Sequence, residues 1–292
     1  MGGLDYVHVD VFADGPFCGN SLPVFVGDTV LTAGQMLQIT RELRHFEAIF
    51  VRPGREAGQV RARIFDLIEE LPFAGHPILG AAAVLQHRAD PGRRGTWTFD
   101  LSGRLVTAVV EPTAAGYSAL LDQGAPQFLG VVETRSEIAE AFGLTGADLE
   151  PDLPIEVAST GLRYCVVPLR PGRIGAARIG ADITGLLRGH GAQFAVLLDG
   201  TALEQRHWNN DGVVEDVATG SAAGVVGAYC VEHGLAQAGE PFALSQGRFA
   251  GRPSRLSVEV DRADGTIASV KVGGGVAFVG RGALDALPEP QP

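Results

Sequence analysis

The sequence is short of cysteine and of positive charge, and both shortages exclude classes of protein. The three cysteines among its 292 residues, Cys18, Cys165 and Cys230, lie far apart. Scattered thiols in this number make no disulfide framework, and their spacing fits no zinc site. Lysine and arginine number 23 against 34 acidic residues, a net charge of −11. This balance argues against nucleic acid and anionic membranes as partners.

Long apolar runs and phosphate-binding glycine motifs are missing as well. No segment approaches the roughly 20 apolar residues of a membrane-spanning helix. The start, MGGLDYVHVD, lacks the pattern of a signal peptide, so we expect a cytoplasmic protein. No GxGxxG leads from a strand into a helix, and no P-loop occurs. The length favours two domains.

One stretch that is present, Gly212–Cys230, places carboxylates before a turn and an apolar helix. Glu215 and Asp216 come first, and Thr219 or Ser221 is expected to cap the helix. Because this helix has no polar face, it must be buried on every side. A carboxylate, a hydroxyl and free N–H groups at such a helix start favour the binding of a small anion. The alternative is an ordinary buried helix whose acids face solvent.

A second stretch, Glu70–His87, has the same order: acids, then Gly75 and His76, then a small apolar helix. Gly75 and Gly220 are 145 positions apart, so one copy lies in each half of the chain. This spacing suggests an internal duplication. We therefore expect two buried helices whose starts, with His76 and Ser221, face each other across a cleft.

The rest of the chain reads mainly as strands, which predicts an α+β fold rather than a doubly wound nucleotide fold. The expected architecture is two pseudo-symmetric lobes, each a barrel-like sheet wrapped around a central buried helix. We place the N-terminal lobe at residues 1–124, joined by the C-terminal segment 278–292, and the C-terminal lobe at 125–277. The glycine triplet 273–275 is expected to form a bend among strands.

Glu47 is the candidate general acid/base. We expect Phe46, Ile49 and Phe50 to surround it with apolar bulk, which removes hydration from the carboxylate. Such a setting suits a group that takes and gives a proton at neutral pH. The alternative is a glutamate on the exposed face of a half-buried strand.

Motifs along nearly the whole chain resemble those of one known family. The most specific are ELPFAGHP at 70–77 and VVEDVATGSAAG at 213–224; others are DVF at 10–12, GN at 19–20, RE at 41–42, RIF at 63–65, QG at 246–247 and GRPS at 251–254. Through these motifs the chain resembles the phenazine-biosynthesis isomerases, which share their fold with the diaminopimelate epimerases.

The resemblance implies two lobes with the active site in the cleft between them, no metal, no organic cofactor and a homodimer. It also implies a cytoplasmic enzyme of antibiotic biosynthesis that isomerises a small cyclic amino-carboxylate, as the type member does with trans-2,3-dihydro-3-hydroxyanthranilate. The positions that match the family's catalytic residues are Glu47, His76 and Asp216; those that match its substrate-binding residues are Asn20, Gly75, Gly220 and Ser221.

Five residues depart from the family pattern, namely Ser21, Phe46, Ala48, Asp66 and Leu67. They bear on the substrate more than on the fold. Three alternatives stay open at this point. One is an epimerase or racemase, although the thiol type needs a cysteine at each helix start. The second is a non-catalytic binding relative of the same fold. The third is a metal site at His45, Glu47 and His76.

Overall fold

The computed structural model describes residues 3–290, which form two compact units. The first unit holds the residues up to Leu121 together with those from Gly273 onward, and the second is Asp122–Val272. The divisions therefore fall between residues 121 and 122 and between 272 and 273, a few residues before the expected ones. Each unit is described by itself.

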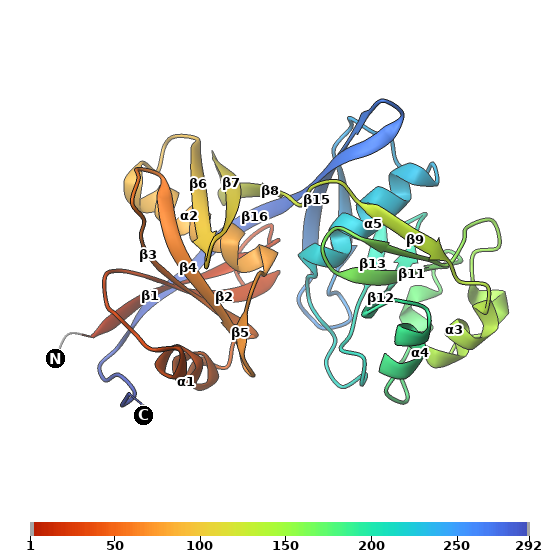
Figure 1. Cartoon of the computed structure of the whole chain (residues 1–292), viewed down its shortest axis with the longest axis horizontal. Helices are drawn as coiled ribbons and strands as arrows, with labels where there is room; N and C mark the ends of the chain where they lie inside the picture. The colour runs from red at the N-terminus through yellow and green to blue at the C-terminus, as the bar shows by residue number, and fades with distance from the viewer. Residues whose placement is uncertain (1–2, 291–292) are drawn as a thin grey trace. The chain divides into compact units, whose positions relative to one another are not determined.

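The first unit is a closed barrel of eight strands (Figure 1). The strand order is β1-β2-β3-β4-β6-β7-β8-β16, and the antiparallel pairing of β16 with β1 closes the ring. A two-residue strand, β5 (Glu70–Leu71), pairs with β4 beside the ring. The ring strands are β1 (Leu4–Val11), β2 (Asn20–Val26), β3 (Glu47–Pro53), β4 (Gln59–Asp66), β6 (Gly95–Leu101), β7 (Arg104–Thr113), β8 (Gly116–Asp122) and β16 (Thr266–Leu284).

Strand β16 runs without interruption through the glycine triplet, so the expected bend is wrong. A Cβ at Gly273 would overlap the backbone carbonyl of Ala119, and one at Gly275 would overlap that of Ala13. The glycines are there because neighbouring backbone comes too close for any side chain.

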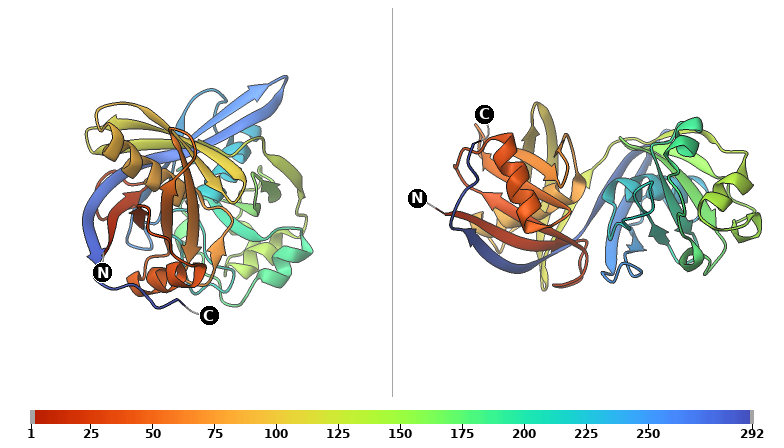
Figure 2. Two further views of the ribbon diagram at one scale, coloured as in Figure 1. Left: turned by 60° about the vertical axis from the view of Figure 1, so that its left-hand side comes forward. Right: turned by 90° about the horizontal axis from the view of Figure 1, so that it is seen from below.

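Helix α2 (Gly75–Ala89) lies against the inner face of this barrel. A Cβ at Gly80 would press on Leu22, Val11 and Val9, so the helix touches β1 and β2 through its glycine. Helix α1 (Ala33–Leu43) lies outside the ring, as Figure 2 shows. Its Met36 and Ile39 pack on outward-facing side chains of β2, β3 and β4.

The second unit is a sheet in the order β16-β15-β14-β13-β12-β11-β10-β9. Backbone bonds between Val270 and residues 123 and 124 also tie the segment before β9 to β16. The remaining strands are β9 (Gln127–Val131), β10 (Glu156–Ser159), β11 (Arg163–Leu169), β12 (Phe194–Asp199), β13 (Glu204–Arg206), β14 (Phe242–Gln246) and β15 (Ser254–Ala263).

Helix α5 (Gly220–Glu232) packs on β15, β11, β10 and β12, and residues 222–231 are all buried. A separate apolar cluster joins α3 (Arg135–Ala141) and α4 (Thr184–Gly189) to this sheet. Two short 3₁₀ turns, Gly146–Asp148 and Ile174–Ala176, complete the unit. The α+β class and a buried helix against sheet in each unit are thus confirmed. Between residues 3 and 290, no helix is both long and apolar enough to cross a membrane.

Candidate active site

Glu47 and His76 lie side by side in the first unit. The distance from His76 Nδ1 to Glu47 Oε2 is 3.0 Å, and their side chains are 8% and 19% exposed respectively. The contact is close but poorly aligned: Glu47 Oε2 and His76 Nε2 are both fully buried, and neither has a directed hydrogen bond within residues 3–290. Buried polar atoms in this state are costly.

The pleat of β3 explains how Glu47 reaches His76. Successive side chains of a strand point to opposite faces, so Glu47 shares a face with Ile49 and not with Phe50. Phe50 instead belongs to the cluster outside the barrel, and Phe46 is 43% exposed. The expected apolar setting of Glu47 is therefore wrong in detail.

Asp66 and Glu70, which lie close to this pair in the chain, are occupied elsewhere. Asp66 is the cross-strand partner of Glu47, but its Oδ1 accepts hydrogen bonds from the backbone N–H groups of Ile68 and Glu69. Glu70 accepts two hydrogen bonds from Arg63. Both acids thus shape the turn before α2.

The two buried helices begin without a side-chain cap, whereas the surface helix α1 is fully capped. Thr32 and Gln35 form a reciprocal capping box at α1. Ala74 precedes α2 and Thr219 precedes α5, and neither makes a side-chain cap bond. The first turns of α2 and α5 also contain no acidic residue. The helix starts at Gly75 and Gly220 therefore have no side-chain cap and no acid in their first turn to offset the positive dipole end.

Thr219 does not cap α5 because its hydroxyl binds Asp216 instead. Thr219 Oγ1 donates to Asp216 Oδ2 at 2.6 Å and accepts from Gln246 Nε2 at 2.9 Å. Gln246 also donates to the backbone carbonyl of Asp216, and its Oε1 accepts from Gln205 Nε2 and from the N–H of Thr219. This buried network fixes the Asp216 carboxylate at the start of α5. Gln246 stands in one of the recognised motifs, but sequence reasoning assigned it no role.

Ser221 lies one residue into α5 and is hydrogen-bonded to the hydroxyl of Tyr164 at 2.8 Å. The ring of Tyr164 packs edge-on against His207, with 5.6 Å between ring centroids. His207 Nδ1 donates to the carbonyl of Ala195 at 2.8 Å. Burial lowers the pKa of His207, while the charge of Asp216 opposes that shift in part. His207 is therefore neutral at pH 7, with Nε2 as its unprotonated nitrogen. No sequence signal pointed to Tyr164.

The last candidate is Asn20, and Asp216 has a neighbouring acid with a structural role. Asn20 is buried at the first position of β2, opposite Val11. Glu215, next to Asp216, forms a two-bond ion pair with Arg206, which is stacked on Trp208. The adjacent carboxylates of the sequence thus separate into one structural residue and one residue at the helix start.

The thiol type of epimerase and the metal site find no support in the residues suggested for them. Cys165 and Cys230 are fully buried, and burial raises the pKa of each thiol to about 12, so neither supplies a thiolate. Among residues 3–290 no group of three histidine, cysteine or acidic side chains is placed to hold a metal ion. In the suggested trio, His45 instead bonds Ser21 at 2.8 Å.

Comparison with known proteins supplies the wider context. The family model described as phenazine biosynthesis-like protein matches residues 9–282. The trans-2,3-dihydro-3-hydroxyanthranilate isomerase of Pseudomonas fluorescens is 31% identical, over 96% of this chain and 99% of its own. An "uncharacterized isomerase" of Salmonella typhimurium is 33% identical, over 91% of this chain and 93% of its own. The structure of a "predicted epimerase" from Pseudomonas aeruginosa is 47% identical, with a TM-score of 0.89 over 97% and 99%.

The family-model match and the fold, two units with a buried helix in each, together define the class of protein. The chain belongs to the phenazine biosynthesis-like family, and it is an isomerase. His76, Asp216, Thr219 and Gln246 lie in motifs through which the sequence resembled that family, and Glu47, the neighbour of His76, stands at a position that matches it.

Proposed function

We propose that this isomerase acts on a small cyclic amino-carboxylate and that Glu47 moves a proton between two ring carbons. The carrying observation is the buried Glu47–His76 contact, in which each residue keeps a polar atom without a directed hydrogen bond. A carboxylate held beside an imidazole and short of partners is suited to take and return a proton. Relatives named for trans-2,3-dihydro-3-hydroxyanthranilate support the substrate class.

The proposed reaction follows from one carboxylate acting twice. Glu47 removes the proton from the ring carbon that bears the hydroxyl group, and the electron pair enters the diene. Glu47 then returns the proton to another ring carbon, and the enol formed relaxes to an aminoketone. Atoms balance, and the steps use no metal and no organic cofactor. His76, 3.0 Å away, is proposed to hold the carboxylate in position.

The binding roles follow from the two uncapped helix starts. The N–H groups at Gly75 and Gly220 are proposed to bind the substrate carboxylate, with Ser221 adding a hydroxyl. Asp216, fixed by Thr219 and Gln246, is proposed to accept from the substrate amine. Asn20 is proposed to contribute its amide. We further propose that the enzyme works as a cytoplasmic homodimer, which sedimentation equilibrium would reveal as twice the chain mass of 30.5 kDa.

An epimerase acting on another amino-carboxylate is the second candidate, because the 47% identical structure carries the name "predicted epimerase". An epimerase would remove the proton from the carbon between the amine and the carboxylate and return it to the opposite face. With no reactive thiol at a helix start, this reaction would also depend on Glu47. A non-catalytic binding relative would need no such acid.

Proton NMR in deuterated water separates these functions. Purified enzyme treated with chelator would be mixed with trans-2,3-dihydro-3-hydroxyanthranilate, beside Glu47→Gln and the control Glu42→Gln, whose residue is exposed on α1. We expect turnover with deuterium in the product ring for the wild type and Glu42→Gln only. Full activity of the Glu47→Gln variant would exclude Glu47 as the group that carries the proton. If the wild type is inactive on this substrate but exchanges and inverts the α-carbon of another amino-carboxylate, the epimerase function replaces the first.

A further inference from the structure

A cavity lies on the outer face of the first unit's barrel. Its volume is about 240 Å³, and its walls come from the segment 27–36 and from strands β3, β4 and β6. Neither Glu47 nor His76 lines it. Phe50 and Arg52 reach it from the face of β3 opposite to the one that carries Glu47. The cavity is therefore separate from the Glu47–His76 pair.

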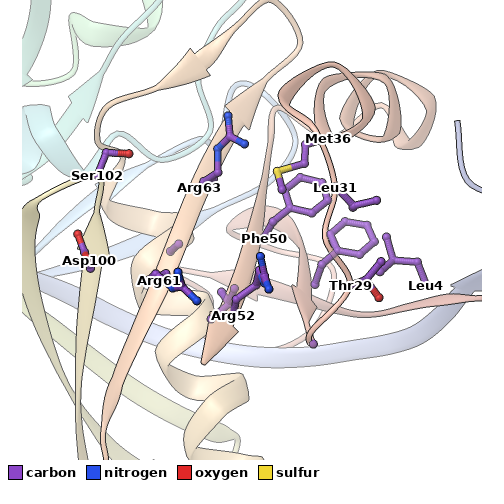
Figure 3. Close-up of a pocket in the computed structure, with 14 residues that line it drawn as sticks. Leu4, Thr29, Leu31, Met36, Phe50, Arg52, Arg61, Arg63, Asp100 and Ser102 are labelled. Atoms are coloured by element: carbon purple, nitrogen blue, oxygen red, sulfur yellow. The ribbon is translucent and has the colours of Figure 1, made fainter. Parts of the chain in front are cut away.

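One side of this outer cavity is apolar. Phe25 and Phe50 are stacked with 4.6 Å between ring centroids and 4° between ring planes. Leu31 and Met36 lie next to them, and all four side chains are buried. Figure 3 shows Leu31, Met36 and Phe50 together on one side, with the arginines beside them. The wall can cover an apolar body of modest size.

The other side carries two arginines from neighbouring strands. Arg52 on β3 and Arg61 on β4 are direct cross-strand partners. Like charges in this relation destabilise a sheet. Within residues 3–290 no carboxylate lies within 4.0 Å of either guanidinium. The Nε of Arg52 is fully buried and has no hydrogen-bond partner among those residues.

The nearby acids do not cancel this charge. Asp100 is the register neighbour of Arg61 on β6, yet its Oδ1 accepts from the N–H of Gly103 and it forms no ion pair with Arg61. Arg63, at the same cavity, is neutralised by its two-bond pair with Glu70. In a chain of net charge −11, this cavity thus carries more positive than negative charge beside an apolar wall, since Asp100 is the only acid among its lining residues.

We propose that the outer cavity binds a small monocarboxylate with an apolar body. The carboxylate of the ligand lies between Arg52 and Arg61 and relieves their repulsion. It accepts a hydrogen bond from the buried Nε–H of Arg52. Guanidinium groups favour this acid because they match a carboxylate with paired, charge-assisted bonds. The apolar part lies on Phe50 and Met36. A dianion without an apolar part, or an apolar molecule without charge, would satisfy only half of the site.

Binding of octanoate to the full chain tests this directly. The sequence has two methionines, and Met36 lines the cavity, so carbon-13 methyl labelling of methionine gives a simple NMR reporter. Octanoate should shift the Met36 methyl signal saturably. Acetate, octylamine and octanol, which lack the apolar body, the negative charge and any charge respectively, should bind at least about tenfold more weakly.

The test variant carries both Arg52→Gln and Arg61→Gln. Its matched control is Arg188→Gln, because Arg188 is an exposed arginine on α4. The double variant should weaken octanoate at least about tenfold, whereas Arg188→Gln should bind as the wild type does. Because it removes a like-charge pair, the double variant should unfold at the same or a higher temperature without ligand. This separates loss of the site from loss of the fold.

Several outcomes overturn the proposal. They are no saturable shift with octanoate, equal binding of octanol or octylamine, equal binding of acetate, or equal affinity in the double variant. A change in sedimenting mass caused by the double variant alone would assign this face to contact between copies of the chain, and the ligand proposal would fall.

Discussion

At the scale of single residues, the contacts of each acid distinguish Glu47 from the acids near the helix starts. Glu215 and Glu70 are acids near the helix starts, but each is fully engaged by an arginine. Glu47 and His76 touch each other and still keep buried polar atoms without directed bonds. That difference, and not proximity to a motif, is the physical reason to place the proton transfer at Glu47.

Replacement of His76 tests whether the imidazole serves Glu47. We expect His76→Gln to lower kcat by about 10²- to 10³-fold, because Glu47 loses its orienting neighbour. The KM should change much less. The control is His87→Gln in the last turn of the same helix, where the ring contacts Tyr117 and Phe278. Equal losses in both variants, with equal losses of thermal stability, would make His76 a packing residue only.

His207 predicts how stability depends on pH. Burial lowers its pKa, so the folded protein binds fewer protons than the unfolded chain once the pH falls below the ordinary value of 6.5. The contribution of His207 to stability is complete above pH 6.5 and is lost as the pH falls. The loss is about 1.4 kcal/mol for each unit between the pKa values of the unfolded and folded states. Urea unfolding of His207→Asn should therefore depend less on pH below 6.5 than the wild type.

His190, half-buried at the end of α4, provides the comparison for that experiment. His190→Asn should keep the wild-type pH dependence. An identical acid dependence of stability in the wild type and in His207→Asn would contradict the assignment.

At the scale of elements, the long strand β16 depends on its glycines for contact and not for flexibility. A Cβ at Gly273 would meet the carbonyl of Ala119, whereas Gly280 in the same strand has open space around it. Gly273→Ala should lower the free energy of unfolding by about 1–3 kcal/mol through overpacking. Gly280→Ala should change it by less than about 0.5 kcal/mol. Equal effects in urea titrations would contradict this reading.

The helices divide by function at the same scale. Helix α1 satisfies its own start through Thr32 and Gln35, as a structural helix does. Helices α2 and α5 leave their starts uncapped although both are buried along their length. Thr219, at the cap position of α5, donates its hydroxyl hydrogen bond to Asp216. The proposed anion binding therefore uses the elements whose termini the fold leaves unsatisfied.

At the scale of the whole molecule, the chain returns to its first unit after building the second. Residues from 273 onward supply the eighth barrel strand, which pairs with β1. A fragment of residues 122–272 should therefore fold alone. A fragment of residues 1–121 should not, because β1 and β8 lose the strand between them.

Circular dichroism and cooperative thermal unfolding of both fragments would check this. Addition of a peptide of residues 273–292 should restore folding to the 1–121 fragment. A cooperatively folded 1–121 fragment without that peptide would show that barrel closure is unnecessary.

Much of the fold could be predicted from local pattern. Alternation located most strands, and the apolar runs after Gly75 and Gly220 located both buried helices. Strand β9 was missed because its five residues, QFLGV, show no alternation and are mostly exposed. The glycine triplet was misread because its reason is a close backbone neighbour distant in sequence.

The sequence by itself determined the class of fold, the two helix starts and the candidate residues, because these depend on local periodicity and on contiguous motifs. Only the tertiary structure decided which of these residues contact one another. Glu47 contacts His76, which is 29 positions away in the chain. The Thr219 hydroxyl donates to Asp216, and Glu215 pairs with Arg206. The tertiary structure also placed Arg52 opposite Arg61. Such pairings follow from strand register and helix placement, which are set by packing between residues far apart in the chain.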